Sequence, residues 1–300
     1  MTGAEAGFLL LTCQLGNPDR RVLTTAQLRV LAQRVRQSAK PDADRELETN
    51  DLLAMGYSAQ HASLILALLS EQELLEYYCQ RGRRQGCYPL TWAHADYPAA
   101  LSRKLADDRP GCLWYKGDLS ILKQPAVALV GSRDLNEKNR VFAREVGRQA
   151  ALQGYALVSG NARGADKTAQ EACLRAGGKV ISVIADELAT KAERENVLYL
   201  SEEGFDAPFS AQRAISRNRV IHALTERTFV AQSALQAGGT WDGTVKNLRF
   251  GWSQVLCYAD GSPAQQQLEQ MGAECVDMDE LKNFMALPTA GRGLFEEETL

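Results

Sequence analysis

The feature that most constrains the fold of this chain is a strand–helix–strand pattern within residues 126–166. Residues 126–130 and 155–158 are short apolar runs typical of buried strands, and residues 140–153 carry apolar side chains at helical spacing. A pattern of this length predicts a βαβ unit, whose two strands are parallel and whose crossover is right-handed. Both strands therefore end at the same edge of one sheet, where open α/β sheets bind their ligands.

Each of these strands leads into a loop that combines glycine with arginine. Glycine lets a ligand approach the backbone N–H groups closely, and arginine offers a planar fork suited to phosphate oxygens. A simple turn would explain either glycine alone, but two such loops at neighbouring strand ends predict a site for an anionic ligand. Asp166 is expected to support the second loop rather than to react. The residues predicted to bind phosphate here are Gly131, Ser132, Arg133, Ser159, Gly160, Arg163, Gly164 and Lys167.

A predicted helix over residues 211–224 adds Arg217, Asn218 and Arg219 to the same site. A regular helix would turn Asn218 toward the sheet, where its amide can hold loop backbone, and would place the two arginines about 100° to either side. Both arginines reach one strand-end pocket only if the helix begins close to them. The alternative for them is a surface ion pair. The acidic residues considered for such pairs are Glu202, Glu203 and Glu226.

Strand and helix patterns alternate from residue 126 onward, which predicts an α/β fold with a Rossmann-like, mostly parallel sheet covered by helices on both faces. At one strand-to-helix junction, Gly238, Gly239 and Thr240 offer N–H groups and a hydroxyl, either to a phosphate or merely to a turn. The remaining predicted strands are 179–184, 197–200, 227–231 and 254–258, and the remaining predicted helices are 166–175, 240–250 and 263–271.

The chain divides into three predicted parts. Residues 1–90 read as a small helical domain, residues 91–286 as the sheet domain, and residues 287–300 as a flexible tail. Residues 87–119 are a linker that becomes the first edge of the sheet domain. They are rich in aromatic side chains, most of which are expected to pack between the domains rather than to stack on bases.

Composition limits the kinds of function that are possible. The net charge is −3 with a pI near 5.8, which argues against nucleic-acid binding through overall charge but leaves room for a local basic pocket. Seven cysteines without a C-x-x-C pair predict reduced thiols in a cytosolic protein. Three histidines far apart in sequence predict no metal site, and no apolar stretch approaches the roughly 20 residues of a membrane span.

Several motifs, in order along the chain, resemble those of the DNA-processing protein A (DprA/Smf) family. Their order and number make the resemblance more specific than any single glycine motif, and they extend from about Tyr97 to Asp260. The matching segments are Tyr97-Pro98, Leu113 to Asp118, Val130-Gly131-Ser132-Arg133, Ser159 to Asp166, Leu200-Ser201-Glu202, Arg217-Asn218-Arg219 and Val230 to Thr240.

The chain also departs from the family pattern. Ala214-Ile215 stand where the family has Phe-Pro, and that Phe is linked to base contact in relatives. Gln170 replaces a family histidine, and the usual Tyr-Pro is missing around residues 185–191. No segment before Leu300 resembles the C-terminal winged-helix domain of many members. We therefore expect a divergent member of the family.

The resemblance implies a cytoplasmic protein that binds single-stranded DNA, protects it, and hands it to a RecA-type recombinase during DNA-mediated transformation or related DNA processing. It also implies a homodimer, a front end like a SAM or helix-hairpin-helix domain, no cofactor and no catalysis. Whether the front-end helices touch DNA or only pack is left open.

Two other functions fit the same fold class. A nucleotide-binding sensor or a phosphoribohydrolase-like enzyme would use a G-G-x-G-T-x-x-E pattern, but Asn247 stands where the glutamate is expected. A dehydrogenase would need G-x-G-x-x-G in the first loop and an acidic residue after the second strand, where Ser159 stands instead.

Overall fold

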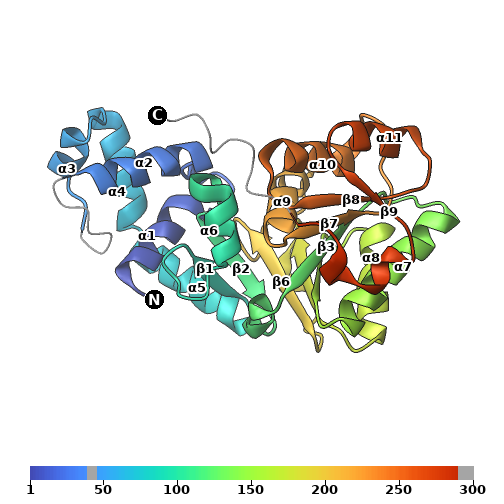
Figure 1. Ribbon diagram of the computed structural model, residues 1–300. Coiled ribbons are helices and arrows are strands. Elements are labelled where there is room, and N and C mark those ends of the chain that lie inside the picture. Colours follow the sequence, from blue (N-terminus) through green and yellow to red (C-terminus); the bar gives the residue numbers. More distant parts are fainter. Residues whose placement is uncertain (39–45, 290–300) are drawn as a thin grey trace.

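The computed structural model describes residues 1–38 and 46–289 and shows two lobes, one of helices and one built on a sheet (Figure 1). Polar N-caps start the longer helices of the first lobe: the hydroxyls of Thr24 and Ser58 each accept a backbone N–H of the first turn. The helices of this lobe are α1 (Gly3–Thr12), α2 (Thr25–Gln37), α3 (Thr49–Ala54), α4 (Ala59–Ser70) and α5 (Gln72–Arg84).

Within the described residues, nine strands form one sheet in the order β1-β2-β6-β5-β4-β3-β7-β8-β9. In this order, the seven strands from β6 through β5, β4, β3, β7 and β8 to β9 are parallel to one another. β2 pairs with β6 in the antiparallel sense, and β1 pairs with β2 in the same way. The strands are β1 (Tyr88–Thr91), β2 (Cys112–Lys116), β3 (Ala126–Val130), β4 (Ala156–Ser159), β5 (Val180–Ile184), β6 (Val197–Glu202), β7 (Arg227–Val230), β8 (Gln254–Tyr258) and β9 (Glu274–Val276).

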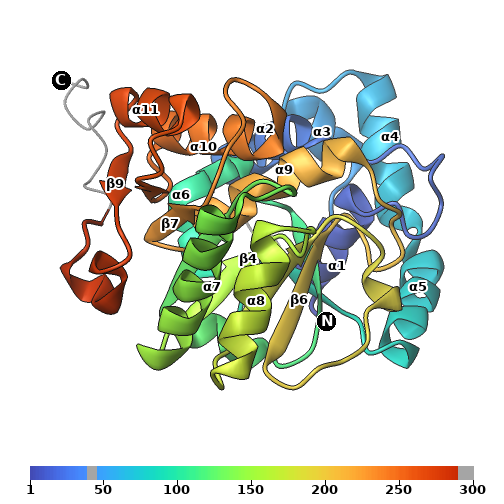
Figure 2. The same ribbon diagram turned by 90° about the vertical axis from the view of Figure 1, so that its right-hand side faces the viewer.

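Helices cover both faces of this sheet. On one face α7 and α8 lie side by side (Figure 2), and α9, α10, α11 and α6 cover the other. These helices are α6 (Ala99–Leu105), α7 (Glu137–Leu152), α8 (Ala165–Arg175), α9 (Ala211–Ala223), α10 (Gly238–Phe250) and α11 (Pro263–Gln270). Single 3-10 turns are η1 (Ala106–Asp108), η2 (Leu119–Lys123), η3 (Leu188–Thr190), η4 (Glu280–Lys282) and η5 (Phe284–Ala286).

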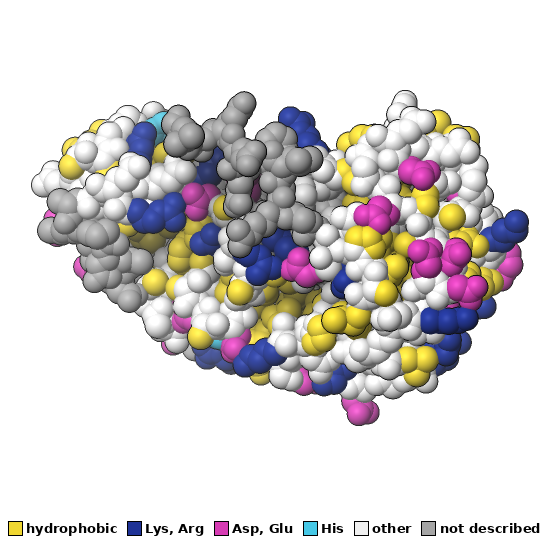
Figure 3. Space-filling model, in the orientation of Figure 1, with side chains coloured by type: hydrophobic (Ala, Val, Ile, Leu, Met, Phe, Trp, Pro, Cys, Tyr) yellow, Lys and Arg dark blue, Asp and Glu magenta, His cyan; other side chains and the backbone are white. Residues whose placement is uncertain are grey.

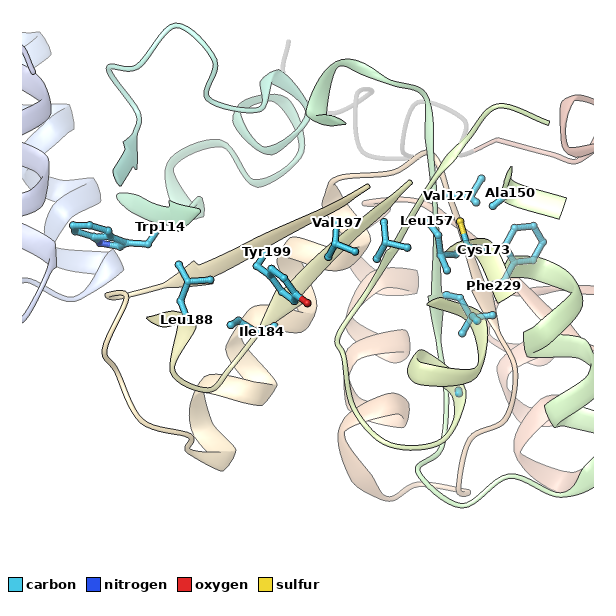
Figure 4. Packing of buried hydrophobic residues seen from close by; sticks show 14 of the residues in the cluster. Trp114, Val127, Ala150, Leu157, Cys173, Ile184, Leu188, Val197, Tyr199 and Phe229 are labelled. Carbon is cyan, nitrogen blue, oxygen red and sulfur yellow. The ribbon is translucent and has the colours of Figure 1, made fainter. Parts of the chain in front are cut away.

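The parallel strands are mostly apolar along their length because both of their faces are buried. Every residue of β5 is buried, as a strand between two helical layers requires. The core on the α7–α8 face runs along the sheet from Trp114 to Phe229 (Figure 4). Gly147 of α7 lets the two helices touch, because a Cβ there would overlap the carbonyl oxygen of Ala169 in α8.

Aromatic side chains join the two lobes. Trp114 of β2 is fully buried, and its ring centroid lies 5.3 Å from that of Tyr78 in α5 and 5.1 Å from that of Phe205. On the other side of the sheet, Phe8 of α1 contacts Trp92, with 5.0 Å between ring centroids. Trp92 and Trp114 therefore pack between the lobes, as predicted for most aromatic residues of this segment, whereas Tyr115 contacts the exposed Tyr88 within the sheet.

The α/β, Rossmann-like architecture predicted from the sequence is confirmed, with small differences at its edges. The sequence placed a first edge of the sheet within residues 87–119 but did not resolve it into the antiparallel strands β1 and β2 and the helix α6. The edge strand β9 was not predicted. The sheet begins at Tyr88, inside the range assigned to the helical domain. Leu287, at the start of the expected tail, is buried, and its carbonyl accepts from Arg227. The rest of that segment, 290–300, lies outside the described residues.

Candidate functional site

Three loops meet at one edge of the sheet, at the carboxyl ends of the neighbouring strands β4, β3 and β7. The chain adds β4, β5 and β6 on one side of β3 and then returns to place β7 on its other side, so β3 and β7 flank the switch point of the fold. Backbone hydrogen bonds tie the loops together: Ser132 donates to the carbonyl of Gln232 at 2.9 Å, and Ala165 donates to the carbonyl of Ser132 at 3.1 Å. We call this edge of the sheet, with its three loops and the helix starts that follow them, the rim.

The predicted glycines permit close contacts within the rim. Gly164 has a φ of +86°, and a Cβ there would meet the carbonyl oxygens of Ser132 and Arg133 in the neighbouring loop. A Cβ at Gly160 would overlap the guanidinium of Arg217. Both glycines are therefore required by close contacts within the chain, whatever ligand the rim holds.

Asp166 has the supporting role that the sequence suggested. Its carboxylate accepts the backbone N–H of Ala162 at 3.1 Å and also interacts with the N–H of Gly160. Burial raises the pKa of Asp166 to about 6, against the opposing effects of the Arg217 guanidinium and of these two N–H groups. The carboxylate thus occupies amides of the loop that would otherwise face an anion, so cationic side chains must provide more of any phosphate binding.

Arg133 and Lys167 are the cations that the rim leaves available. Both side chains are exposed, and neither has an ion-pair partner among residues 1–38 and 46–289. Arg163 lies beside them but donates to Asp134 at 2.9 Å, with both side chains largely exposed. Such an exposed pair contributes little to stability and can open for a ligand.

Arg217 and Ser159 lie beneath the rim rather than on it. Arg217 is 8% exposed, donates to the carbonyl of Val183, and packs against Gly160, and burial lowers its pKa. The hydroxyl of Ser159 is fully buried and accepts from Gln170 at 2.6 Å. The expectation that these two side chains contact phosphate therefore does not match their placement, and their role is to hold strand ends and loops in position.

Arg219 points away from the rim, toward the helical lobe. Its guanidinium pairs with Glu202 at 3.1 Å and also donates to Ser216. This is the ion-pair alternative considered for it from the sequence. Helical spacing correctly placed Arg217 and Arg219 on different sides of α9. The rotation of the helix about its axis buries Arg217 and turns Arg219 toward the helical lobe.

Asn218 holds loop backbone, as predicted: its amide donates to the carbonyl of Gly239 at 3.0 Å. Gly238 and Gly239 are exposed at the start of α10, whose N-cap residue makes no side-chain capping bond. Thr240 is half-buried beside them. The N–H groups and dipole of a helix start favour negative charge at this position.

Gln232 is a rim residue that the sequence analysis missed. Its backbone carbonyl accepts a hydrogen bond from the N–H of Ser132, and its side-chain oxygen accepts the backbone N–H of Asn136 at 3.0 Å. Gln232 therefore links the loops after β3 and β7. Only its place directly after a strand at the switch point could have revealed it.

Other expected features can be located in the same way. Asn247, at the position of a phosphoribohydrolase-like glutamate, is fully buried and holds Ser253. In the described part of the chain, no group of three or more histidine, cysteine or acidic residues is arranged to hold a metal ion. Over residues 1–38 and 46–289, no helix has the length and apolarity needed to cross a membrane.

Comparison with protein families gives a match to the model of DNA recombination-mediator protein A over residues 89–266, more than half of the chain. DNA processing protein DprA of Streptococcus pneumoniae is 35% identical over 152 residues, which are 47% of this chain and 53% of the relative. Protein Smf of Escherichia coli is 31% identical over 142 residues, or 44% of this chain and 38% of the relative. The matched segments thus span about half or less of these relatives.

Solved structures extend the likeness to nearly the whole fold. The crystal structure of the S. pneumoniae DprA superposes with a TM-score of 0.71 at 26% identity, covering 92% of this chain and 95% of that one. A DNA processing protein A from Helicobacter pylori, described for its single-stranded DNA binding mode, has a TM-score of 0.56 at 22% identity. The superposition covers 65% of this chain and 94% of the H. pylori chain. At that identity the second likeness concerns the fold alone.

Proposed function

Since the chain belongs to the DNA recombination-mediator protein A family, as its motifs predicted, we propose that it binds single-stranded DNA along the rim. The observation that carries this proposal is the pair Arg133 and Lys167, two exposed cations without carboxylate partners in the described residues. Arg133 lies in the loop after β3 and Lys167 in the first turn of α8, beside the switch point. The family is described as a mediator of recombination.

In this proposal the rim residues have different roles. Arg133 and Lys167 contact phosphates directly, and Arg163 joins them when its pair with Asp134 opens. Ser132 and the start of α10 at Gly238, Gly239 and Thr240 add hydroxyl and N–H donors. The residues beneath them set the shape of the rim: Gly131, Ser159, Gly160, Gly164, Asp166, Arg217 and Asn218.

A single strand fits this surface better than a duplex. The chain has a net charge of −3, and on the face drawn in Figure 3 the basic and acidic side chains are interspersed over both lobes. A rigid duplex needs cations spread along its length, whereas a flexible strand can bend its backbone to a few local ones. Ile215 and Leu235 are 44% and 46% exposed and offer apolar surface for bases near this site.

We also propose the wider role that the resemblance implies. The protein would act in the cytoplasm as a homodimer, protecting incoming strands and handing them to a RecA-type recombinase during DNA-mediated transformation or related processing. The description of the family as a recombination mediator supports this role.

Fluorescence anisotropy tests the binding proposal. The protein is titrated into labelled single-stranded and double-stranded oligonucleotides of the same sequence at several salt concentrations. We expect tighter binding of the single strand and a steep loss of affinity as salt rises. Equal affinity for both forms, or no binding at low salt, would show that the rim does not serve this function. Addition of mononucleotides to the bound complex distinguishes the nucleotide-sensor alternative, since a sensor would release the strand.

A further inference from the structure

A hollow lies on the other side of α9 from the rim. It has a volume of about 260 Å³ and lies where the helical lobe meets the sheet lobe. Its walls come from the end of α1, the segment leading into α2, the start of β2, the end of β6, and the Ser216 and Arg219 side of α9. Arg219 faces this hollow while Asn218, the preceding residue, faces the rim, so α9 separates two distinct sites.

One carboxylate in the wall has an unused acceptor. Glu202 is 8% exposed, and its Oε2 accepts from Arg219 at 3.1 Å and from Ser216 at 3.4 Å. Its Oε1 is buried and has no hydrogen-bond partner within residues 1–38 and 46–289. A buried carboxylate oxygen without a donor is costly, so this wall favours an N–H or O–H group, from water or from a ligand, beside Glu202.

The charges around the hollow favour a neutral ligand. Glu202 is paired with Arg219, and Glu203 at the same wall is paired with Arg213 at 3.1 Å. Each carboxylate therefore already has a guanidinium, and an added ammonium or phosphate would find no unpaired opposite charge. What is missing is a hydrogen-bond donor and not a counter-ion.

The remaining walls combine apolar and hydroxyl-bearing surface, and the volume of the hollow limits the size of a ligand. Val22, Leu28, Pro110 and Cys112 give apolar surface, and the hydroxyl-bearing residues Thr12, Thr24 and Thr25 lie among them. Sites for drug-sized ligands measure roughly 300–1,000 Å³, so this hollow accepts one small molecule and not a chain of nucleotides. A nucleobase combines flat faces with N–H donors beside acceptors on one edge, and carboxylates read such edges in nucleic-acid complexes.

We propose that this hollow binds a single nucleobase, whose N–H edge donates to Glu202. The base belongs either to a free nucleoside or to an unpaired nucleotide of a bound strand; both present the same edge. Binding of a free nucleoside here does not depend on DNA binding at the rim, whereas binding of an unpaired nucleotide rests on the proposed function.

Calorimetric titration of the full chain with adenosine, guanosine, cytidine and uridine tests the proposal. We expect at least one nucleoside to bind at concentrations up to about 1 mM, the weak end of specific affinities. Glu202→Gln should weaken that binding about tenfold or more, because it replaces a charged acceptor. Val22→Trp should abolish it by filling the hollow, whereas Val30→Trp, on an exposed part of α2, and Lys167→Ala, at the rim, should leave it unchanged.

Strand binding by the same variants identifies the source of the base. If a nucleoside binds and Val22→Trp leaves oligonucleotide affinity unchanged, the site takes free nucleosides. If Val22→Trp also weakens oligonucleotide binding, the site takes a base of the strand. If no nucleoside binds and Val22→Trp changes no oligonucleotide affinity, water alone serves Glu202 and the proposal is wrong. Since Glu202→Gln also alters an ion pair, its thermal unfolding is compared with that of the wild type, and Val22→Trp provides the test that keeps both charges.

Discussion

Removing the two available cations of the rim should reduce the salt dependence of single-strand binding by a defined amount. Arg133 and Lys167 are exposed and unpaired among the described residues, so each is free to displace a counterion from a phosphate. For single strands each neutralised phosphate contributes about 0.7 to the slope of log K against log salt. The double variant Arg133→Ala, Lys167→Ala should therefore have a slope smaller by about 1.4.

The same relation gives the loss of affinity. Relative to about 1 M salt, a slope of about 0.7 corresponds at about 0.1 M to a roughly fivefold increase in the binding constant for each phosphate contact. The double variant should bind about 25-fold more weakly, and less so as salt rises. Neither substitution removes an ion pair or a buried side chain, so the thermal unfolding temperature should stay close to that of the wild type.

Arg175→Ala is the matched control. Arg175 is exposed like Arg133, but it lies at the opposite end of α8 from the rim and pairs with Glu171 at 2.8 Å. Its loss changes the net charge without touching the rim, and the slope should change little. Anisotropy titrations between low and moderate salt give all the slopes. If the double variant has the slope of the wild type, or if Arg175→Ala reduces it equally, then binding is not located at the rim.

Three further predictions concern the fold that holds the rim. Burial raises the pKa of Asp166 to about 6, so protonation of this side chain stabilises the fold at low pH, and the stabilisation is lost as pH rises through that value. Relative to Asp166→Asn, the free energy of unfolding of the wild type should increase by up to roughly 3 kcal/mol from pH 7 to pH 4, measured by urea unfolding. Gly147→Ala should cost about 1–3 kcal/mol because its Cβ overlaps the backbone of α8, while Gly7→Ala in α1, whose added Cβ meets only an ordinary contact at 3.9 Å, should cost nothing; equal effects in thermal unfolding would contradict this. Trp114→Ala should cost about 3–5 kcal/mol and speed proteolysis of the helical lobe, and a cleavage pattern like that of the wild type would mean that other contacts hold the lobes together.

The central strands were predictable because they are buried on both faces. Such strands read as continuous apolar runs, and β3 and β8 have the bounds that the sequence indicated. β1 and β9 are short edge strands of four and three residues, and β1 contains Pro89, so neither apolar run nor periodicity marks them. Their place in the sheet depends on tertiary pairing that local sequence does not encode.

The rim was predictable in its position and less so in its side chains. Parallel strands must end at one edge, so the loops after β3, β4 and β7 had to meet. Which arginines face solvent depends on the rotation of α9 over the sheet, and spacing alone fixes only angles between residues. Arg217 is therefore buried below Gly160, and Arg219 lies in a different hollow.

The outer strands also restrict how copies of this protein can assemble. An added strand would have to pair with β1, where proline removes a donor, or with β9, which offers only three residues. Neither margin is a good template for continuing the sheet from one molecule into the next. If two copies associate, the contact should therefore form between side chains of helices and loops, and point substitutions there should separate the copies without disturbing either fold.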